Sequence, residues 1–152
     1  MKIRELFEEQ SSFLKTREEI EAWLQKMEIE NYTINDDLSV DVNGIVRLSS
    51  TQLTSFPVQF RNVDGNFQCS GNQLTSLQGA PREVGGNFWC GDNKLLTSLQ
   101  GAPREVSGEF DCSNNQLTSL QGGPREVGRD FDCSGNQLTS LQGGPREVGG
   151  NF

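Results

Sequence analysis

A period of about 21 residues constrains this chain more than any other feature. Phenylalanines recur with spacings of 21 (88−67), 22 (110−88), 21 (131−110) and 21 (152−131) residues. The longer spacing coincides with Leu95 and Leu96, which stand where the other copies have one leucine. The residues that keep this period are Phe67, Phe88, Phe110, Phe131 and Phe152, Cys69, Cys90, Cys112 and Cys133, and Asn72, Asn93, Asn115 and Asn136. A fixed period of this size predicts a solenoid, in which each coil buries its apolar face against the neighbouring coils.

Each unit can be interpreted physically from its letters. The pattern F-x-C predicts a short strand with the phenylalanine and cysteine facing inward and the middle residue facing outward. The asparagine after the next bend is expected to satisfy backbone groups that the bend would otherwise bury unpaired. L-T-S-L then returns two leucines to the interior, and Q-G-(A/G)-P-R-E-V turns the chain on the far side before a valine points inward. Stacked coils would pair their strands in parallel at ~4.8 Å per step.

The repeat F-x-C-S-x-N-x-L-T-S-L resembles the leucine-rich repeat pattern L-x-L-x-x-N-x-L-x-x-L, with Phe and Cys in two leucine positions. The resemblance recurs four times in register and covers roughly Gly44 to the last residue. The L-T-S-L run also resembles repeats of bacterial secreted ubiquitin-ligase effectors, although no ligase domain with its catalytic cysteine follows here. Including the segment WLQKMEIENYTINDDLSVDVNGIVRLSS, the chain is similar to short leucine-rich repeat proteins encoded by tailed bacteriophages. The expected fold is therefore α+β: a leucine-rich repeat solenoid with parallel β-strands on its concave face and an N-terminal cap.

The first 44 residues are predicted to form that cap, and residues 45–152 the solenoid, as one continuous structural domain. Apolar residues at helical spacing predict a helix over residues 2–14, and the Thr16–Glu19 capping box predicts a second helix from Arg17. These helices would cover the first coil, whose open side exposes apolar surface and strand edge. A short strand is expected at residues 32–34 and an alternating one at 38–42, which meets Asn43-Gly44, a strong hairpin signal. Residues 46–48 lie 21 residues before Phe67–Cys69 and predict a degenerate first coil.

Composition and charge exclude several partners and point to a cytoplasmic protein. The net charge is −8, with −6 (5 − 11) on residues 1–44 and −2 (8 − 10) on the rest, which argues against nucleic acid and anionic membranes. The start of the chain has no signal-peptide character, and no apolar run approaches a membrane span. The four cysteines could suggest disulfides, but their even spacing favours reduced packing residues of a cytosolic protein. The chain has no histidine and no C-x-x-C pair, so neither a metal nor another cofactor is predicted.

Sequence variation between the copies is concentrated at the outward strand positions. The Q-G-(A/G)-P-R-E-V corner returns almost unchanged, and its Arg-Glu pairs are expected to form a solvated charge ladder. The residues on either side of each phenylalanine differ from copy to copy and predict a partner-binding set of Gln68, Asn87, Trp89, Glu109, Asp111, Asp130 and Asp132. Trp89 is the candidate anchor, because an exposed indole buries a large area at low entropic cost. The four carboxylates could bind a basic partner or a cation, or form a solvated acidic face.

These observations predict a protein-binding module rather than an enzyme. The chain has no activated-nucleophile context and no phosphate-binding glycine loop, and carboxylates on an open surface lack the burial that would raise a pKa. A threonine ladder at 75, 97, 118 and 139 could suggest ice binding, but these threonines alternate with serine and lie off the strand. The phage resemblance implies an accessory protein that occludes a host or anti-phage defence protein in the bacterial cytoplasm. The alternative is a structural or assembly protein that self-associates, as a homodimer, through an uncapped C-terminal coil.

Overall fold

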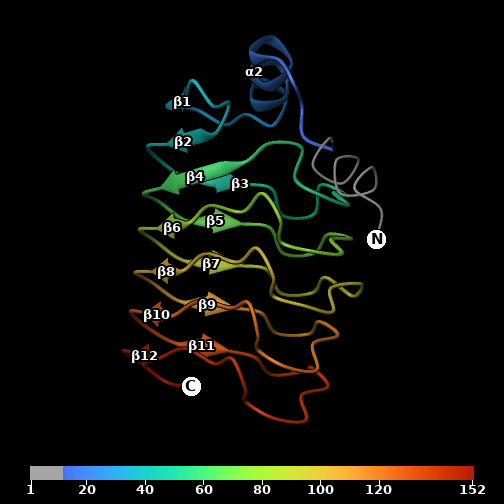
Figure 1. Cartoon of the computed structure of the whole chain (residues 1–152), viewed down its shortest axis with the longest axis vertical. Coiled ribbons are helices and arrows are strands. Elements are labelled where there is room, and N and C mark those ends of the chain that lie inside the picture. Colours follow the sequence, from blue (N-terminus) through green and yellow to red (C-terminus); the bar gives the residue numbers. More distant parts are fainter. Residues whose placement is uncertain (1–11) are drawn as a thin grey trace.

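The computed structural model of the chain describes residues 12–152, which form a β-solenoid with one short helix at its N-terminal end (Figure 1). Helix α2 spans Arg17–Lys26. Seven strands form one sheet, called sheet A, in the order β1 (Tyr32–Ile34), β2 (Val40–Val42), β4 (Phe60–Val63), β6 (Glu83–Val84), β8 (Glu105–Val106), β10 (Glu126–Val127) and β12 (Glu147–Val148). Five strands form sheet B, in the order β11 (Phe131–Asp132), β9 (Phe110–Asp111), β7 (Phe88–Trp89), β5 (Phe67–Gln68) and β3 (Val46–Arg47).

The predicted solenoid is confirmed, and it has a second parallel sheet that the sequence did not predict. The F-x strands pair in parallel and in register, for example Phe67 with Phe88 and Phe88 with Phe110. The Glu-Val pairs of the corner, expected to be a turn, also stack into parallel strands from β6 to β12. Two residues per coil are enough for this sheet, because identical corners place each valine beside the next (Val84 beside Val106). Each coil thus carries one strand of each sheet.

Aromatic rings form a continuous column through the interior, as predicted. Neighbouring rings from Phe67 to Phe152 lie near-parallel, with centroids 5.1–5.4 Å apart. That separation is typical of the offset stacking that aromatic pairs prefer. Phe67, Phe88 and Phe110 are fully buried, whereas Phe152, at the end of the column, is 55% exposed.

The repeated asparagine satisfies the backbone of two coils at once. Asn93 is completely buried, and its Nδ2 donates to the carbonyl oxygens of Cys90 (2.9 Å) and of Cys69 in the preceding coil (3.2 Å). Asn115 repeats this geometry with the carbonyls of Cys112 (2.8 Å) and Cys90 (3.2 Å). No buried side-chain nitrogen or oxygen among residues 12–152 lacks a hydrogen-bond partner. The column of asparagines therefore provides hydrogen-bond donors for backbone carbonyls that the bends would otherwise bury without partners.

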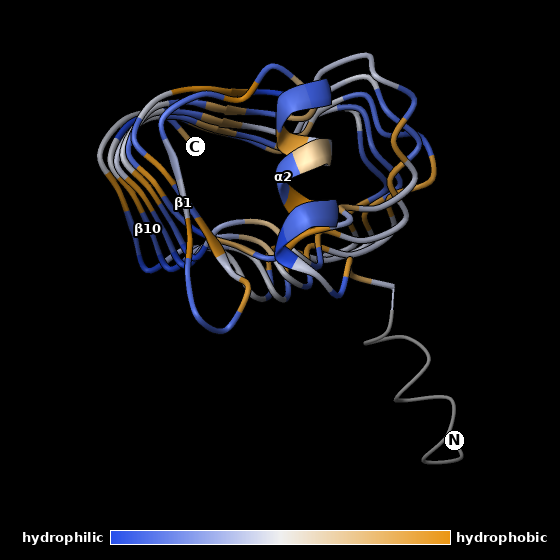
Figure 2. Cartoon of the chain, turned by 90° about the horizontal axis from the view of Figure 1, so that it is seen from above, coloured by the Kyte–Doolittle hydropathy of each residue, from blue (hydrophilic) through white to orange (hydrophobic). Residues whose placement is uncertain are grey.

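The N-terminal cap covers the first coil with helix α2 (Figures 1 and 2). The predicted N-cap of this helix forms: the Glu19 N–H donates to Thr16 Oγ1 (3.2 Å), and the Thr16 hydroxyl donates to Glu19 Oε1 (2.9 Å). The apolar face of α2 buries Ile20 and Leu24. Trp23 packs on Phe60 with ring centroids 6.2 Å apart. Viewed from above, α2 lies over the area that the coils enclose, so it replaces the coil that would otherwise stack there (Figure 2).

The prediction of a hairpin at Asn43-Gly44 is wrong. The antiparallel hairpin joins β1 to β2, pairing Tyr32 with Val42, and β2 itself pairs in parallel with β4. Gly44 instead occupies the corner at which each coil leaves sheet A, where the Gly65 N–H donates to the Gly44 carbonyl (3.0 Å) and Gly86 does the same to Gly65 (3.0 Å). The glycine at 44 therefore belongs to the 21-residue period, and tertiary stacking overrides the local turn signal.

The first predicted helix, residues 2–14, lies almost wholly outside the described residues. Residues 12–14 are described and belong to no helix or strand. The Leu14 N–H donates to the Pro57 carbonyl (2.8 Å), which ties the segment before α2 to the first coil. The degenerate first coil is confirmed, because Val46 and Arg47 pair in register with Phe67 and Gln68.

Candidate functional site

The outward face of sheet B carries one column of side chains that varies along the solenoid, with only its last two members alike. The residue after each inward phenylalanine or valine stands in parallel register with its neighbours: Arg47, Gln68, Trp89, Asp111 and Asp132. Arg47 is exposed and the other four are half-buried. This face is the one predicted to be the concave binding surface, and the column runs along the solenoid axis at ~4.8 Å per coil.

Trp89 lies at the centre of this column. Its strand neighbours Phe88 and Cys90 are completely buried, so the alternation of the strand turns the indole outward. It stands opposite Gln68 on one side and Asp111 on the other. A half-buried indole between an amide and a carboxylate offers an apolar surface next to hydrogen-bonding groups, which is a common composition for protein contacts.

The two aspartates of the column each use one carboxylate oxygen for local structure. Asp111 Oδ1 accepts from the Ser113 N–H (2.8 Å), and Asp132 Oδ1 accepts from the N–H (2.9 Å) and the hydroxyl (2.6 Å) of Ser134. These bonds fix the carboxylates at the start of the bend. The second oxygen of each carboxylate makes no hydrogen bond within residues 12–152 and can accept from a partner.

Asn87 and Asp130, predicted to be partner-binding, connect neighbouring coils. Asn87 Oδ1 accepts from the Glu109 N–H (2.8 Å), and Asp130 Oδ1 accepts from the Asn151 N–H (2.8 Å). Asn66 makes the same bond to the Asn87 N–H (2.8 Å). We call this series the Asx ladder. Its side-chain oxygens fill the space where a Cβ would project from the glycine of the next coil, 2.2–2.3 Å away for Gly86, Gly108 and Gly150.

Glu109 breaks the Asx ladder, and the break is accompanied by Arg129, which was not predicted to be a functional residue. The longer Glu109 side chain makes no bond to the Asp130 N–H, which has no acceptor among the described residues. The following coil carries Arg129 where the others carry glycine. Because no ladder oxygen fills that space, a side chain is tolerated there. The signal was present in the sequence: Arg129 is the one departure from glycine in the column of 65, 86, 108 and 150.

A hollow of about 760 Å³ lies where the cap meets the first strand of sheet B. Its lining includes Glu28, Ile29 and Glu30 from the segment after α2, and Ile45 and Arg47 from the start of the first coil. Its size is in the range of ligand pockets. Arg47 belongs both to this hollow and to the outward column, so the two features are continuous.

The outward face of sheet A has a different character. Its glutamates stand in strict parallel register, and every arginine and glutamate of the corner is exposed, as predicted: Arg82, Glu83, Arg104, Glu105, Arg125, Glu126, Arg146 and Glu147. The one ion pair within residues 12–152 joins Arg61 to Asp41 of the cap. None of the repeated corners therefore has a fixed ionic partner in this part of the chain.

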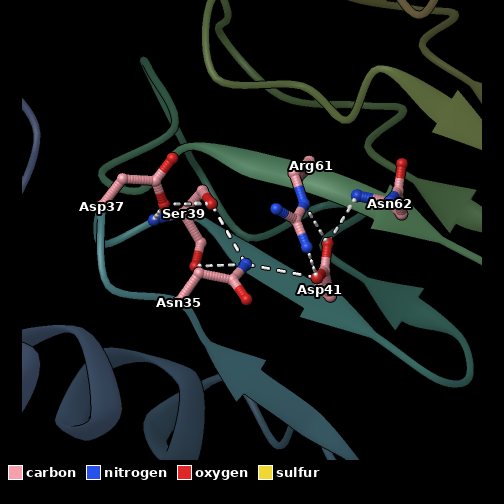
Figure 3. Close-up of polar contacts among 6 residues, drawn as sticks. All are labelled: Asn35, Asp37, Ser39, Asp41, Arg61 and Asn62. Carbon is pink, nitrogen blue, oxygen red and sulfur yellow. Dashed lines mark hydrogen bonds and ion pairs between the residues drawn. The ribbon is translucent and has the colours of Figure 1, made fainter.

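The Asp41 network fastens the cap to the solenoid (Figure 3). Asp41 Oδ1 accepts from Arg61 Nε (3.0 Å) and the Asn62 N–H (3.1 Å), and Oδ2 accepts from Arg61 Nη2 and from Asn35 Nδ2 (3.2 Å). The Arg61 guanidinium, followed by the Asn35 amide and the Asn62 N–H, lowers the pKa of Asp41 despite some burial. Asp37, which accepts from both the hydroxyl and the N–H of Ser39, also has a lowered pKa.

The cysteines are unpaired and lie along the interior, as predicted. Cys69, Cys90 and Cys112 are fully buried, and Cys133, which follows β11, is half-buried. Burial is the main cause that raises the pKa of each thiol above its ordinary value. Low-pKa, exposed thiols are the reactive ones, so this column favours packing over nucleophilic chemistry. Within residues 12–152 no three histidine, cysteine or carboxylate side chains gather in a way that could hold a metal ion.

Comparison of the chain with protein-family models, with curated proteins and with solved structures finds no match in any of the three. In the part of the chain that the structure describes, no helix has the length and apolar character needed to cross a membrane.

Proposed function

We propose that this chain is a non-enzymatic protein-binding module and that its binding surface is the outward face of sheet B, centred on Trp89. One observation carries the proposal: the two sheets are built from the same coils, yet from β6 to β12 sheet A repeats one outward glutamate, while the outward residues of sheet B vary. The column Gln68, Trp89 and Asp111 changes at each coil, whereas Glu105 and Glu126 on sheet A do not. Stacking constrains the inward residues of both sheets equally, so variation on one outward face alone is best accounted for by recognition.

The resemblance to phage-encoded leucine-rich repeat proteins extends the proposal to the biological role of the chain. In this role the chain is a phage accessory protein in the bacterial cytoplasm, and it occludes a host or anti-phage defence protein by covering part of that protein's surface. The support is the sequence similarity, which spans the repeats and the segment from Trp23 to Ser50. Occlusion needs no chemistry from the bound protein. It therefore suits a chain whose thiols are buried and whose carboxylates lie at the surface.

The test compares capture of bacterial proteins by the intact chain, by Trp89→Ala and by Leu95→Ala. Leu95 is a matched control, because it is a large apolar residue of the same coil, 56% exposed and outside both sheets. A specific partner should be captured by the intact protein and by Leu95→Ala, and lost or much reduced with Trp89→Ala. Equal capture by all three proteins would show that Trp89 and the sheet B face do not bind the partner.

Self-association through the last coil is a second candidate, favoured by a separate observation. Among the residues that the structure describes, β11 and β12 lie at the edges of their sheets, and Leu141 and Phe152 that follow β11 are 57% and 55% exposed. Two such ends could pair as a homodimer and cover these apolar groups. Light scattering across a dilution series tests this: a mass that falls to that of a monomer on dilution supports it, and a monomer at every concentration excludes it.

A further inference from the structure

We infer that the sheet B face binds a cationic segment of its partner, laid along the solenoid axis from the cap hollow, across Trp89, to the carboxylates of the last two coils. This inference rests on the proposed function and adds the chemistry of the partner.

The column itself suits an extended segment. From Arg47 to Asp132 it crosses four in-register steps, which at ~4.8 Å per step amount to ~19 Å. An extended peptide of about six residues covers this length. The hollow of about 760 Å³ at the Arg47 end gives such a segment a place to insert a side chain.

Charge complementarity selects a cationic occupant. At the cap end the hollow is lined by Glu28 and Glu30, against the single cation Arg47. At the far end, Asp111 and Asp132 stand in register and each keeps one unused carboxylate oxygen. A guanidinium would find planar, bidentate acceptors there, and Trp89 one step away can stack on the same group.

The break in the Asx ladder supports this assignment independently of the column. At three other positions the chain uses Asn or Asp to bond the next coil, whereas Glu109 gives up that bond. The result is a half-buried carboxylate near Asp111 that makes no hydrogen bond or ion pair within residues 12–152. A structural role would favour the asparagine that Asn66 and Asn87 exemplify, so the glutamate is explained by what it contacts outside the chain.

The experiment measures binding of a dye-labelled peptide with three arginines separated by glycines, by fluorescence anisotropy at about 50 mM salt, where surface charges are weakly screened. Its counterpart with glutamines in place of the arginines is the neutral probe. We expect the intact protein to bind the arginine peptide and not the neutral one. Asp111→Asn/Asp132→Asn should weaken this binding roughly five-fold, since two partly exposed charge pairs are lost. The amide oxygens still accept from Ser113 and Ser134, so the fold is kept.

The matched control is Glu105→Gln/Glu126→Gln on sheet A, which removes two in-register carboxylates from two neighbouring coils and changes the net charge by the same amount, from −8 to −6 (−8 + 2). We expect this variant to bind the peptide as the intact protein does. Arg47→Gln should strengthen binding, because it removes the cation within the column.

Three outcomes overturn the inference: no binding by the intact protein, binding of the neutral peptide with equal strength, or equal loss in the two double variants, which would mean diffuse attraction to an acidic protein. These failures are separable from failure of the proposed function. If Trp89→Ala loses a captured partner while Asp111→Asn/Asp132→Asn retains it, the face binds protein but not through cations.

Discussion

The outward faces of sheets A and B are made by the same coils and yet differ in almost every respect. Sheet A presents Glu105, Glu126 and Glu147 in an unbroken row beside a row of arginines, and none of these corners has an ion pair with another described residue. Sheet B presents a tryptophan between an amide and two aspartates. In sheet A the exposed outward side chains repeat although they form no ion pair within residues 12–152, and in sheet B the outward side chains vary although both sheets belong to the same coils.

The difference separates two kinds of constraint on a repeat. Stacking fixes the inward residues and the bends, because each coil must match the one before it. It does not fix the outward residues, so the outward positions of sheet B are free to serve the proposed binding. The Asx ladder adds detail, since it shows that at Glu109 the chain departs from a structural rule that it follows on both sides.

The largest expected effect lies in the interior that both faces share. Asn93→Ala removes one of the two amide donors to each of the buried carbonyls of Cys69 and Cys90, and leaves the Leu74 N–H without its acceptor. We expect a loss of about 3 kcal/mol in the free energy of unfolding, since these hydrogen bonds are lost and the buried Leu74 N–H is left unpaired. Urea unfolding followed by circular dichroism measures it. Gln73→Ala, an exposed neighbouring position in the repeat, should change stability little; equal effects would mean that the asparagine column is not what supports the bends.

A double-mutant cycle on Glu109 and Arg129 sharpens the account of the Asx ladder. Glu109→Asn alone should destabilise the protein, because the new asparagine oxygen would collide with the Cβ of Arg129. The equivalent pair one coil earlier shows the clash: the Asn87 oxygen lies 2.2 Å from the Cβ that Gly108 would carry. With Arg129→Gly added, the oxygen can accept from the Asp130 N–H. We expect the free energy of unfolding of the double variant to exceed the sum of the two single effects by about 1 kcal/mol, which is the net contribution of one such hydrogen bond. A coupling energy near zero would show that the ladder and the glycine column are unrelated.

Replacing glutamates of sheet A tests whether its row of like charges has a structural purpose. In-register carboxylates repel, so Glu105→Gln/Glu126→Gln should raise the free energy of unfolding by a few tenths of a kcal/mol. Thermal unfolding at low and high salt measures it, and the gain should shrink as salt screens the charges. A clear loss of stability would indicate that the arginines beside the glutamate row form ion pairs with it. The outward face of sheet A would then have a structural role that the contrast with sheet B leaves out.

The smallest effect is expected at the Asp41–Arg61 pair. The pKa of Asp41 is lowered in the folded chain, so its contribution is complete above the ordinary carboxyl pKa of about 4 and is lost as the pH falls through the lowered value. Asp41→Asn should therefore reduce stability at pH 7 and make little difference at pH 2. Melting curves at both values measure this, with Asp64→Asn, an exposed aspartate outside the network, as control. A deficit that persists unchanged at pH 2 would assign the effect to the Asn35 and Asn62 bonds rather than to charge.

Much of the interior could be predicted from particular residues. The Phe67–Phe131 column, the buried cysteines and the coil-bridging role of Asn93 follow from a period that repeats apolar and amide side chains at fixed offsets. The Thr16 cap followed from a local motif. Gly44 was assigned to a hairpin because local turn signals do not report which coil the chain will meet next. The roles of Asn87 and Asp130 were missed for the same reason, because their bonds run to residues of the following coil.

By itself, the sequence determined that the chain stacks into coils, which residues face inward, and which outward positions vary, because periodicity and alternation are properties of the letters. Only the tertiary structure decided that the Glu-Val corners form a second sheet, that the Asx ladder bridges the coils and that Glu109 and Arg129 depart from it together. These features depend on which atoms of neighbouring coils come within bonding distance, and that distance is set by stacking rather than by any single repeat.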